Sequence, residues 1–551
     1  MSTKQWTTKR AEKLARLEAI ASLADGKVLP TDNMVEALEL LIKPNDRVVL
    51  EGNNQKQADF LARVLEEVNP DKINHLHMIM PSVSLPSHMN IFEKGIATKL
   101  DFAFAGPQSV RVAQMLEDGL LEIGAIHTYI ELYARLYADL IPNVALVCGY
   151  KADRKGNLYT GASTEDTPGL VEAPAFKDGL VIAQVNEIVE NTDDLDRVDI
   201  PGDWVDFIVQ ADKPFYIEPL FTRDPRLIKD THILMAMMAI KGIYAKHGVQ
   251  TLNHGIGFNT AAIELLLPTY GEQLGLKGKI CKHWILNPHP TLIPAIESGW
   301  VETVHSFGGE LGMEEYARAR SDVFFTGPDG SMRSNRTMSQ LAGQYAADMF
   351  IGSTLQMDPE GNSSTVTHGR LAGFGGAPNM GHDPRGRRHA TDAWLNMITE
   401  EEKQHDVVKG RKLVVQAVET FQDGSKSTFV DRLDAVDVAK KAGMPVAPIM
   451  IYGDDVTHLL TEEGIAYLYM AKDLEERKAM IAAVAGVSEF GQRVTAERVK
   501  ALRDAGKVVT PEDLGIKRSD ANRSLLAAKS VSDLVKWSDG LYQPPAKYRS
   551  W

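Results

Sequence analysis

Cysteine is scarce in this chain of 551 residues, which contains only Cys148 and Cys281. Both lie in apolar runs typical of strands, so the sequence offers neither a disulfide framework nor the ligand spacing of a zinc site. His75 and His77 lie two residues apart, but no third ligand stands near them, and we expect them to pack rather than bind metal. We therefore expect no metal, and a reducing cytoplasm as the compartment.

Long hydrophobic runs are also missing. The longest, residues 233–240, is far shorter than the roughly 20 residues that a membrane helix needs, so we expect a buried helix there and no membrane partner. Residues 1–25 alternate charged and apolar side chains, which predicts an amphipathic N-terminal helix rather than a signal peptide.

Positive charge is in deficit, since 74 acidic residues against 60 basic ones give a formal net charge of −14. This balance argues against nucleic acid as a partner. The exception is residues 367–391, THGRLAGFGGAPNMGHDPRGRRHAT, with six glycines and four arginines. Glycines let a ligand approach main-chain N–H groups, and arginines make forked contacts with carboxylates or phosphates. The segment predicts a small-anion site, and the alternative is a solvated surface loop.

Apolar, β-branched runs alternate with helical stretches along most of the chain, a pattern typical of mostly parallel sheets covered by helices. The predicted strands are 47–51, 74–80, 100–105, 121–126, 144–147 and 179–186, then 249–253, 278–286, 301–307, 322–326, 352–357, 412–418 and 446–452. We therefore predict an α/β protein with two related, open, mostly parallel-sheet domains. Their predicted bounds are 26–221 and 231–471, with a linker at 222–230 and a helical C-terminal extension at 472–551.

Several well-known catalytic motifs are absent. The sequence has no G-x-x-x-x-G-K-[ST], G-x-S-x-G or H-E-x-x-H, which disfavours P-loop NTPases, serine hydrolases and zinc hydrolases. Gly255-Ile256-Gly257 lies between a predicted strand and helix, but Thr260 replaces the third glycine of a dinucleotide fingerprint. Phosphate or thioester binding and a plain tight turn both remain open for this segment.

Four segments together resemble the coenzyme A transferase superfamily. They are VALVCGYKADRKGNLYTGAS followed by DGLVIAQVNE, then HGIGFNTAAIE, then GSTLQMDPEGNSS with the G-x-G-G of residues 373–376, and finally VTHLLTEEGIAYLY. Within that superfamily, GGAPNMGHDPRGRRH and DLVKWSDGLYQPPAKYR resemble the malonate decarboxylase α-subunit family, over essentially the whole chain.

The resemblance implies a transferase that exchanges the acetyl group on a carrier-protein thioester for malonate, giving malonyl-S-carrier protein and acetate. The implied cofactor is coenzyme A or the phosphoribosyl-dephospho-coenzyme A arm of the carrier. The implied partners are an acyl carrier protein and decarboxylase subunits. We also expect this chain to form a homo-oligomer. A citrate lyase-like α subunit or a free coenzyme A transferase is the alternative within the enzymes. A non-catalytic scaffold that binds coenzyme A is the alternative outside them.

One departure from the superfamily concerns mechanism. Members that form an enzyme-bound thioester use a glutamate, but here no acid lies between Glu272 and Glu297, and the matching positions fall near Leu286 and Asn287. We therefore predict direct exchange through a mixed anhydride of acetate and malonate, which needs positioning and oxyanion donors but no protein nucleophile. Glu51 and Glu264 are the alternatives for the missing nucleophile.

The site is expected between the domains, at the carboxyl ends of their strands. We assign the oxyanion hole to the amides of Gly375 and Gly376, and orientation of the acyl or malonyl group to Asn379. The second carboxylate of malonate is assigned to Arg370, Arg387 or Arg388, and Asn53 and Gln55 are candidates from the other domain. The candidates for contact with the carrier arm are Gly255, Gly257, Gly373, Ala377 and Pro378.

Overall fold

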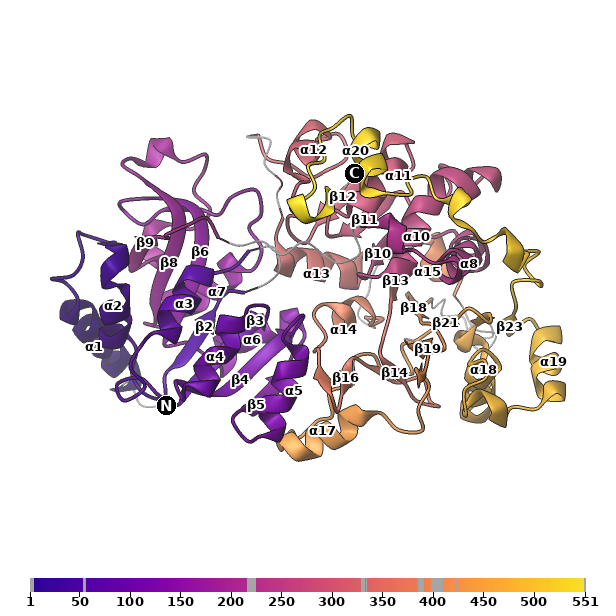
Figure 1. Ribbon diagram of the computed structural model, residues 1–551, viewed down its shortest axis with the longest axis horizontal. Coiled ribbons are helices and arrows are strands. Elements are labelled where there is room, and N and C mark those ends of the chain that lie inside the picture. Colours follow the sequence, from indigo (N-terminus) through magenta and orange to yellow (C-terminus); the bar gives the residue numbers. More distant parts are fainter. Residues whose placement is uncertain are drawn as a thin grey trace.

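Two lobes, each built around one sheet, lie side by side in the computed structural model (Figure 1). It describes residues 4–52, 56–215, 224–328, 332, 334–384, 391–397, 410–422 and 424–549. The chain passes from the first lobe to the second between Gln210 and Asp230. None of the described helices is long and apolar enough to cross a membrane.

The first sheet has nine strands in the order β1-β9-β8-β6-β2-β3-β4-β5, and all are parallel except β7, which pairs antiparallel with β6. Successive side chains of β2 enter different cores, because Val48 and Leu50 face one side of the sheet and Val49 the other. The strands are β1 (Val28–Leu29), β2 (Arg47–Leu50), β3 (Leu76–Ser82), β4 (Ala97–Phe104), β5 (Glu122–Ile126), β6 (Val144–Asp153), β7 (Leu158–Tyr159), β8 (Leu180–Val189) and β9 (Phe207–Gln210).

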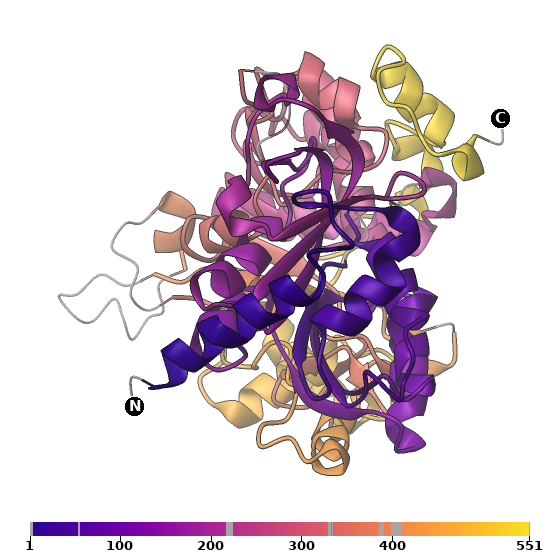
Figure 2. The same ribbon diagram turned by 90° about the vertical axis from the view of Figure 1, so that its left-hand side faces the viewer.

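Helices cover both faces of this sheet, as buried parallel strands require (Figure 1). They are α2 (Met34–Leu41), α3 (Asp59–Glu66), α4 (Pro86–Glu93), α5 (Ser109–Glu117), α6 (Tyr129–Ala138) and α7 (Thr167–Phe176). The N-terminal helix α1 (Lys4–Ala19) lies across the outer end of the lobe, in indigo in Figure 2. It is tied down by Arg16, which donates to Asp46 at 2.5 Å and to the carbonyl of Leu41 at 3.0 Å.

The second sheet repeats this plan. Its order is β12-β11-β10-β13-β18-β21-β22-β23, and only the β21-β22 and β22-β23 pairs are antiparallel. In each lobe one early strand separates the strands that follow it directly from the later ones: β2 has β3, β4 and β5 on one side, and β10 has β11 and β12 on one side. The second-sheet strands are β10 (Thr251–His254), β11 (His283–Leu286), β12 (Thr303–Ser306), β13 (Met349–Gly352), β18 (Leu413–Ala417), β21 (His458–Leu460), β22 (Ile465–Ala466) and β23 (Val508–Val509).

The apolar run near residue 235 forms the buried helix α8 (Asp230–Ala239), as predicted. The other second-lobe helices are α9 (Ala245–His247), α10 (Phe258–Leu266), α11 (Ile293–Glu297), α12 (Glu314–Ala319), α13 (Arg336–Tyr345), α14 (Ala377–Met380), α15 (Asp392–Leu395) and α17 (Asp434–Ala442). The C-terminal stretch contains α18 (Leu474–Ala483), α19 (Ala496–Asp504) and α20 (Val531–Trp537). It also contains β23, so the stretch expected to be helical contributes the last strand of the second sheet.

Two predicted strands of the second lobe are wrong. Residues 322–326 form only isolated bridges, between Val304 and Phe324 and between Thr326 and Met332. Residues 446–452 form only one, between Ser363 and Ile451. Pro448 lies inside that second run and has no N–H to donate to a ladder, which explains why its apolar residues stay irregular.

Part of the second lobe packs into the core of the first. The hairpin of β16 (Val366–Thr367) and β17 (Arg370–Leu371) contributes Val366 and Leu371, and α17 contributes Val438, to the core that contains β2 and β3. The same contact is visible in Figure 1, where α17 lies beneath β5 and α5. The chain just after this hairpin is thereby held at the boundary between the lobes.

Two further short hairpins pair β14 (Gln356–Met357) with β15 (Ser363–Ser364), and β19 (Phe421–Gln422) with β20 (Lys426–Ser427).

Candidate active site

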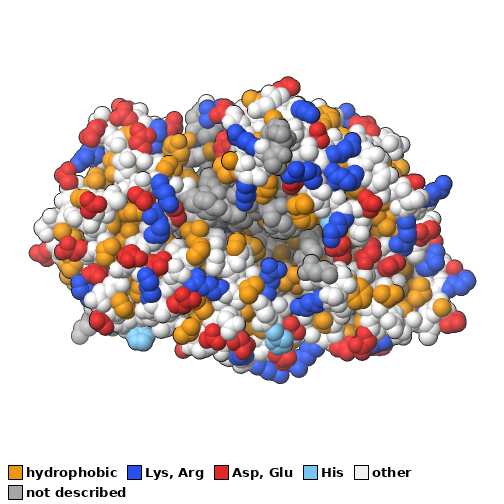
Figure 3. All heavy atoms as spheres, viewed as in Figure 1, with side chains coloured by type: hydrophobic (Ala, Val, Ile, Leu, Met, Phe, Trp, Pro, Cys, Tyr) orange, Lys and Arg blue, Asp and Glu red, His pale blue; other side chains and the backbone are white. Residues whose placement is uncertain are grey.

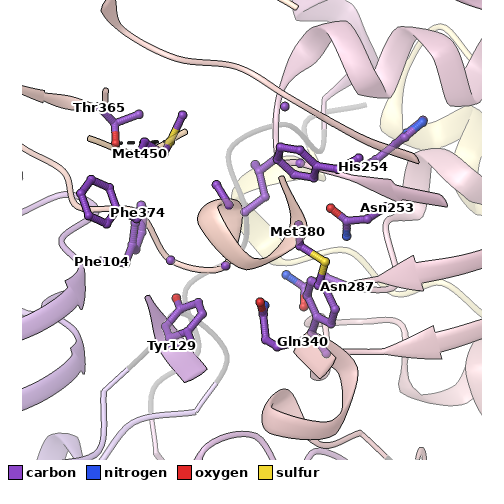
Figure 4. A pocket seen from close by; sticks show the side chains of 18 of the residues that line it. Phe104, Tyr129, Asn253, His254, Asn287, Gln340, Thr365, Phe374, Met380 and Met450 are labelled. Atoms are coloured by element: carbon purple, nitrogen blue, oxygen red, sulfur yellow. Dashed lines mark hydrogen bonds between the residues drawn. The ribbon is translucent and has the colours of Figure 1, made fainter. Parts of the chain in front are cut away.

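A cavity of about 240 Å³ lies between the lobes, at the carboxyl ends of β10 and β13. Strand order reverses between these two neighbours, and open α/β sheets bind ligands at such a point. In Figure 4, Phe104 and Phe374 lie on one side of α14, and Asn253 and His254 lie on the other. The first lobe contributes Phe104 and Tyr129, and the second contributes Asn253, His254, Gly255, Asn287, His289, Arg336, Gln340, Gly352, Gly373, Phe374, Gly375, Gly376, Ala377 and Met380, among others.

The face of the molecule drawn in Figure 3 carries acidic and basic side chains interspersed, without a large field of one sign. Among the described residues, charge on this face therefore does not mark an anion site. The chemistry has to be found in the polar groups that line the cavity.

The glycine-rich segment reaches the cavity by pairing with the end of β4. The N–H groups of Phe374 and Gly375 both donate to the carbonyl of Ala103, at 2.8 and 2.9 Å. Gly373 and Gly375 adopt φ of +71° and +59°, in the left-handed region that favours glycine. Because the Gly375 amide is already bonded, it is no donor for an oxyanion in this arrangement. Gly376 lines the cavity and its amide has no acceptor among the described residues, so it remains the candidate.

A side chain on Gly376 would have to displace Gln340. A Cβ there would lie 2.2 Å from Nε2 of Gln340, which projects from α13. Within the described chain, Oε1 of Gln340 and Oδ1 of Asn287 are buried and have no hydrogen-bond partner. Buried polar atoms normally have partners, so these two amides are available to a ligand.

The end of β10 forms the second-lobe wall. A Cβ on Gly255 would lie 3.2 Å from the Cα of Gly352, so glycine here permits close packing of β10 against β13. Gly257, the N-cap of α10, does not line the cavity. Thr260 stabilises this turn, because its hydroxyl donates to the carbonyls of Gly255 and Gly257 at 2.7 and 2.9 Å.

Behind this wall lies a buried carboxylate, Glu264 of α10. Its Oε1 is 3.0 Å from Nδ1 of His254 and 3.0 Å from Nδ1 of His289, and its Oε2 accepts from the hydroxyl of Thr291 at 2.5 Å. Burial alone would raise the pKa of Glu264, but the charge of His289 and the hydrogen bonds from both histidines outweigh it and hold that pKa well below its usual range. Both histidines line the cavity, so this carboxylate acts on it through them.

Arg336 joins the two lobes at the cavity wall. Its guanidinium is 2.6 Å from Oε2 of Glu165 and 2.7 Å from Oδ1 of Asp166, and it lies 4.5 Å from the centre of the Tyr129 ring. The side chain is only 6% exposed, so this ion pair is shielded from water. Glu165 and Asp166 of the first lobe bind Arg336 of the second, so this ion pair holds the lobes together. Because two carboxylates neutralise its charge, Arg336 is not assigned to an acid substrate.

The structure brings five of the predicted site residues to the cavity: Gly255, Gly373, Gly375, Gly376 and Ala377. Pro378 lines a neighbouring cavity with His382 and Asp455. Asn379 does not line the main cavity, although its Nδ2 is buried without a partner among the described residues. Asn53, Gln55, Arg387 and Arg388 lie outside the described residues.

The placement of Arg370 corrects its assignment to malonate. Its side chain is exposed and its Nε donates to the hydroxyl of Ser109 at 3.2 Å. The β16–β17 hairpin holds it against the start of α5 in the first lobe, away from the residues that line the cavity.

Sequence reasoning did not single out several lining residues: Tyr129, Asn253, His254, His289, Arg336 and Gln340. Two of them carried a signal. His254 directly precedes Gly255-Ile256-Gly257, and His289 stands two residues after Asn287, next to the position where the transferase glutamate was missing. Arg336 and Gln340 lie on a helix whose sequence has no feature of a site.

Comparison with known proteins is decisive for the family. A family model described as "Malonate decarboxylase, alpha subunit, transporter" matches residues 5–551. The chain belongs to the malonate decarboxylase α-subunit family. This confirms the resemblance seen in the sequence.

Individual members of the malonate decarboxylase α-subunit family align with this chain over nearly their full length. The chain is 60% identical over 553 residues to an acetyl-S-ACP:malonate ACP transferase of Malonomonas rubra, covering 100% of this chain and 99% of that protein. It is 70% identical, with a TM-score of 0.97 and 100% of both chains covered, to a chain in the crystal structure of a Pseudomonas malonate decarboxylase hetero-tetramer in complex with malonate. With the malonate decarboxylase α subunit of Acinetobacter baumannii the identity is 68% and the TM-score 0.95, covering 98% of this chain and 100% of that chain.

The fold class is also confirmed. An acyl-CoA transferase of Escherichia coli O157:H7 is only 13% identical but aligns with a TM-score of 0.52, over 81% of this chain and 88% of that one. At this identity the likeness concerns the fold alone, which is the two-domain α/β fold of coenzyme A transferases.

Proposed function

We propose that this chain is the transferase that exchanges the acetyl group on a carrier-protein thioester for malonate, releasing acetate and leaving malonyl-S-carrier protein. The observation that carries the proposal is the cavity between the lobes, lined by the glycine-rich segment, in a chain 60% identical over its whole length to an acetyl-S-ACP:malonate ACP transferase.

The dimensions of the cavity support thioester chemistry on small acyl groups. A volume of about 240 Å³ is below the range of pockets that enclose drug-sized ligands, so the cavity suits an acetyl group with malonate rather than a whole nucleotide. The carrier arm, either coenzyme A or the phosphoribosyl-dephospho-coenzyme A group, would then present only its thiol end. Gly255, Gly373 and Ala377 remain the candidates for contact with that end.

The groups on the cavity wall fit the charges that the reaction develops. The Gly376 N–H is positioned to donate to the oxyanion formed when a carboxylate attacks the acetyl carbonyl, and one such preorganised donor contributes about 3 kcal/mol. Our assignment for holding the malonate is the side-chain NH2 groups of Asn287 and Gln340, since both residues line the cavity and a carboxylate accepts only from the nitrogen of an amide. These amides replace Arg370 as the proposed contacts of malonate. Asn379 does not line the cavity, so it could orient the acyl or malonyl group only if α14 shifted.

Direct exchange through a mixed anhydride remains our mechanism. Glu51 is fully buried, close to Lys56, and bonded by Thr167 and the amide of Cys148, and it does not line the cavity. Both oxygens of Glu264 are engaged by His254, His289 and Thr291. A carboxylate must free an oxygen to attack a thioester, so neither glutamate is placed as a nucleophile.

We further propose that the chain works in a multi-subunit complex, since a family member 70% identical to it was crystallised in a malonate decarboxylase hetero-tetramer. An acyl carrier protein is the partner that the exchange requires, and decarboxylase subunits are the partners that the family resemblance implies.

The proposal is tested by offering the protein an acetylated carrier protein together with malonate, citrate or no acid. We expect malonyl-S-carrier and acetate to form only with malonate. Exchange with citrate and none with malonate would instead support a citrate lyase-like α subunit. Binding of the carrier without exchange of any acid would support a scaffold.

A further inference from the structure

A histidine of the cavity is held by a buried carboxylate in the manner of a catalytic dyad. His289 follows β11 in the segment Asn287-Pro288-His289-Pro290, and its side chain is 4% exposed. Its Nδ1 lies 3.0 Å from Oε1 of Glu264, and the residue lines the cavity together with the glycine-rich segment. Carboxylates in this position fix the ring orientation and tautomer of a histidine and stabilise its protonated form.

The neighbouring histidine is not equivalent. His254 uses both ring nitrogens, since its Nδ1 faces Glu264 at 3.0 Å and its Nε2 pairs with the Tyr244 hydroxyl at 2.9 Å. No group in the described part of the chain is hydrogen-bonded to Nε2 of His289. Only His289 therefore has a ring nitrogen available to a ligand.

We propose that His289, positioned by Glu264, transfers a proton to and from the carrier sulfur during acyl exchange. The inference rests on the proposed function and deepens it. An alkyl thiolate is a poor leaving group because its conjugate acid has a pKa near 8.5, so a proton donor at the sulfur accelerates its departure.

A malonate oxygen bonds to the acetyl carbon, the C–S bond breaks, and its electron pair goes to sulfur, which takes the proton from Nε2 of His289. The product of this half is a mixed anhydride of acetate and malonate. In the second half the sulfur bonds to the malonyl carbon, Nε2 takes the proton back, and acetate leaves with the electron pair of the broken C–O bond. His289 ends in the form in which it began.

The charged and titratable groups near His289 come from several elements. Glu264 of α10 is the group paired with it, and His254 at the end of β10 shares that carboxylate. Arg336 of α13 and Tyr129 of α6 also line the cavity, but the arginine charge is balanced by Glu165 and Asp166.

The test is His289→Asn in the full chain, because the asparagine amide still donates to Glu264 in place of Nδ1 while nothing replaces Nε2. Two acetyl thioesters are compared with malonate present: one of an ordinary alkyl thiol, such as N-acetylcysteamine, and one of trifluoroethanethiol, which leaves readily as the thiolate. The expected loss is about 10²–10⁴-fold for the alkyl thioester and under about tenfold for the trifluoroethyl thioester. His289→Gln is the second variant if the first does not fold.

The matched control is His283→Asn, which alters an exposed histidine of β11 that bonds Thr303, and it should keep the wild-type rate on both thioesters. Equal losses on the two thioesters, or no loss on either, would overturn the role of His289. A wild-type protein that exchanges no malonate would overturn the proposed function instead, so the two failures are distinguishable.

Discussion

Glu51 in the first lobe and Glu264 in the second are both fully buried, and they are stabilised in different ways. Glu51 follows β2 and lies 3.4 Å from the ammonium of Lys56, with the Thr167 hydroxyl donating to it at 2.6 Å. Glu264 in α10 is bonded by two histidines and a threonine. Lysine keeps its charge near neutral pH, whereas histidine gains and loses a proton there. We infer that the first cluster supports structure and the second supports chemistry.

The position of each cluster agrees with this division. Thr167 begins α7 directly after Glu165 and Asp166, which bind Arg336 across the lobe boundary, so the Glu51 cluster continues into the contact between the domains. The two histidine partners of Glu264 line the cavity. Two glutamates that were equal candidates for a nucleophile in the sequence thus have separate parts in the structure.

The largest expected effect is on stability. Glu51→Ala leaves Lys56 buried without its counter-charge, and breaking a buried pair in this way lowers the free energy of unfolding by about 3–5 kcal/mol. Urea unfolding measures it, with Glu122→Ala, an exposed position at the start of β5, as the control expected within about 0.5 kcal/mol of wild type. A loss below about 1 kcal/mol for Glu51→Ala would remove the structural part assigned to this cluster.

The next effect is on exchange. Glu264→Gln keeps the size of the side chain but removes the charge that holds His289, so we expect exchange of an alkyl thioester to fall about 10²-fold. As a positioning residue, Glu264 should show the same dependence on the leaving thiol as His289→Asn. Glu51→Gln is the comparison, with exchange per folded molecule within a few-fold of wild type. If both variants lose exchange equally, the two clusters do not divide as inferred.

A third effect concerns the oxyanion donor. Gly376→Ala places a Cβ 2.2 Å from Nε2 of Gln340, so the Gln340 side chain or the Gly376 backbone must shift, and we expect about a tenfold or greater loss of exchange with little change in stability. Gly369→Ala is a close control in the same glycine-rich segment, because a Cβ there meets nothing within 4 Å. Wild-type exchange in the Gly376 variant would contradict the assignment of Gln340 and of the tightly packed Gly376 backbone to the site.

The smallest effect is the pH dependence of stability, and its sign differs between the clusters. Burial raises the pKa of Glu51, although Lys56 opposes this shift. The carboxyl therefore stabilises the folded state most below its unfolded pKa of about 4.3, and this contribution is lost as the pH rises through its folded pKa. Glu264 has a lowered pKa, so its contribution is complete above about 4.3 and is lost as pH falls toward the folded pKa. Unfolding free energies of wild type, Glu51→Gln and Glu264→Gln between about pH 3 and 7 measure both slopes, and slopes of the same sign would contradict the assignment.

The fold and the placement of the glycine-rich segment were predictable because they depend on local pattern. Alternating strands and helices predicted the parallel sheets, and the glycines that follow GSTLQMD reach the cavity. The bonding of individual groups was not predictable, because it arises across the lobes. The Gly375 N–H donates to the carbonyl of Ala103, and Arg370 donates to the hydroxyl of Ser109 in the other lobe. Neither hydrogen bond can be predicted from the sequence. His289 stands two residues after Asn287, but the carboxylate that bonds it, Glu264, is 25 residues away in the chain.

The central claim is that malonate attacks the acetyl thioester directly. Malonate carrying ¹⁸O in its carboxylates is mixed with the acetylated carrier and this protein for a single turnover, and the acetate released is analysed by mass spectrometry. Direct exchange predicts one ¹⁸O in each acetate, because the oxygen that bridges the mixed anhydride comes from malonate. Unlabelled acetate in that first turnover would contradict the claim, because its new oxygen would then have come from a carboxylate of the protein.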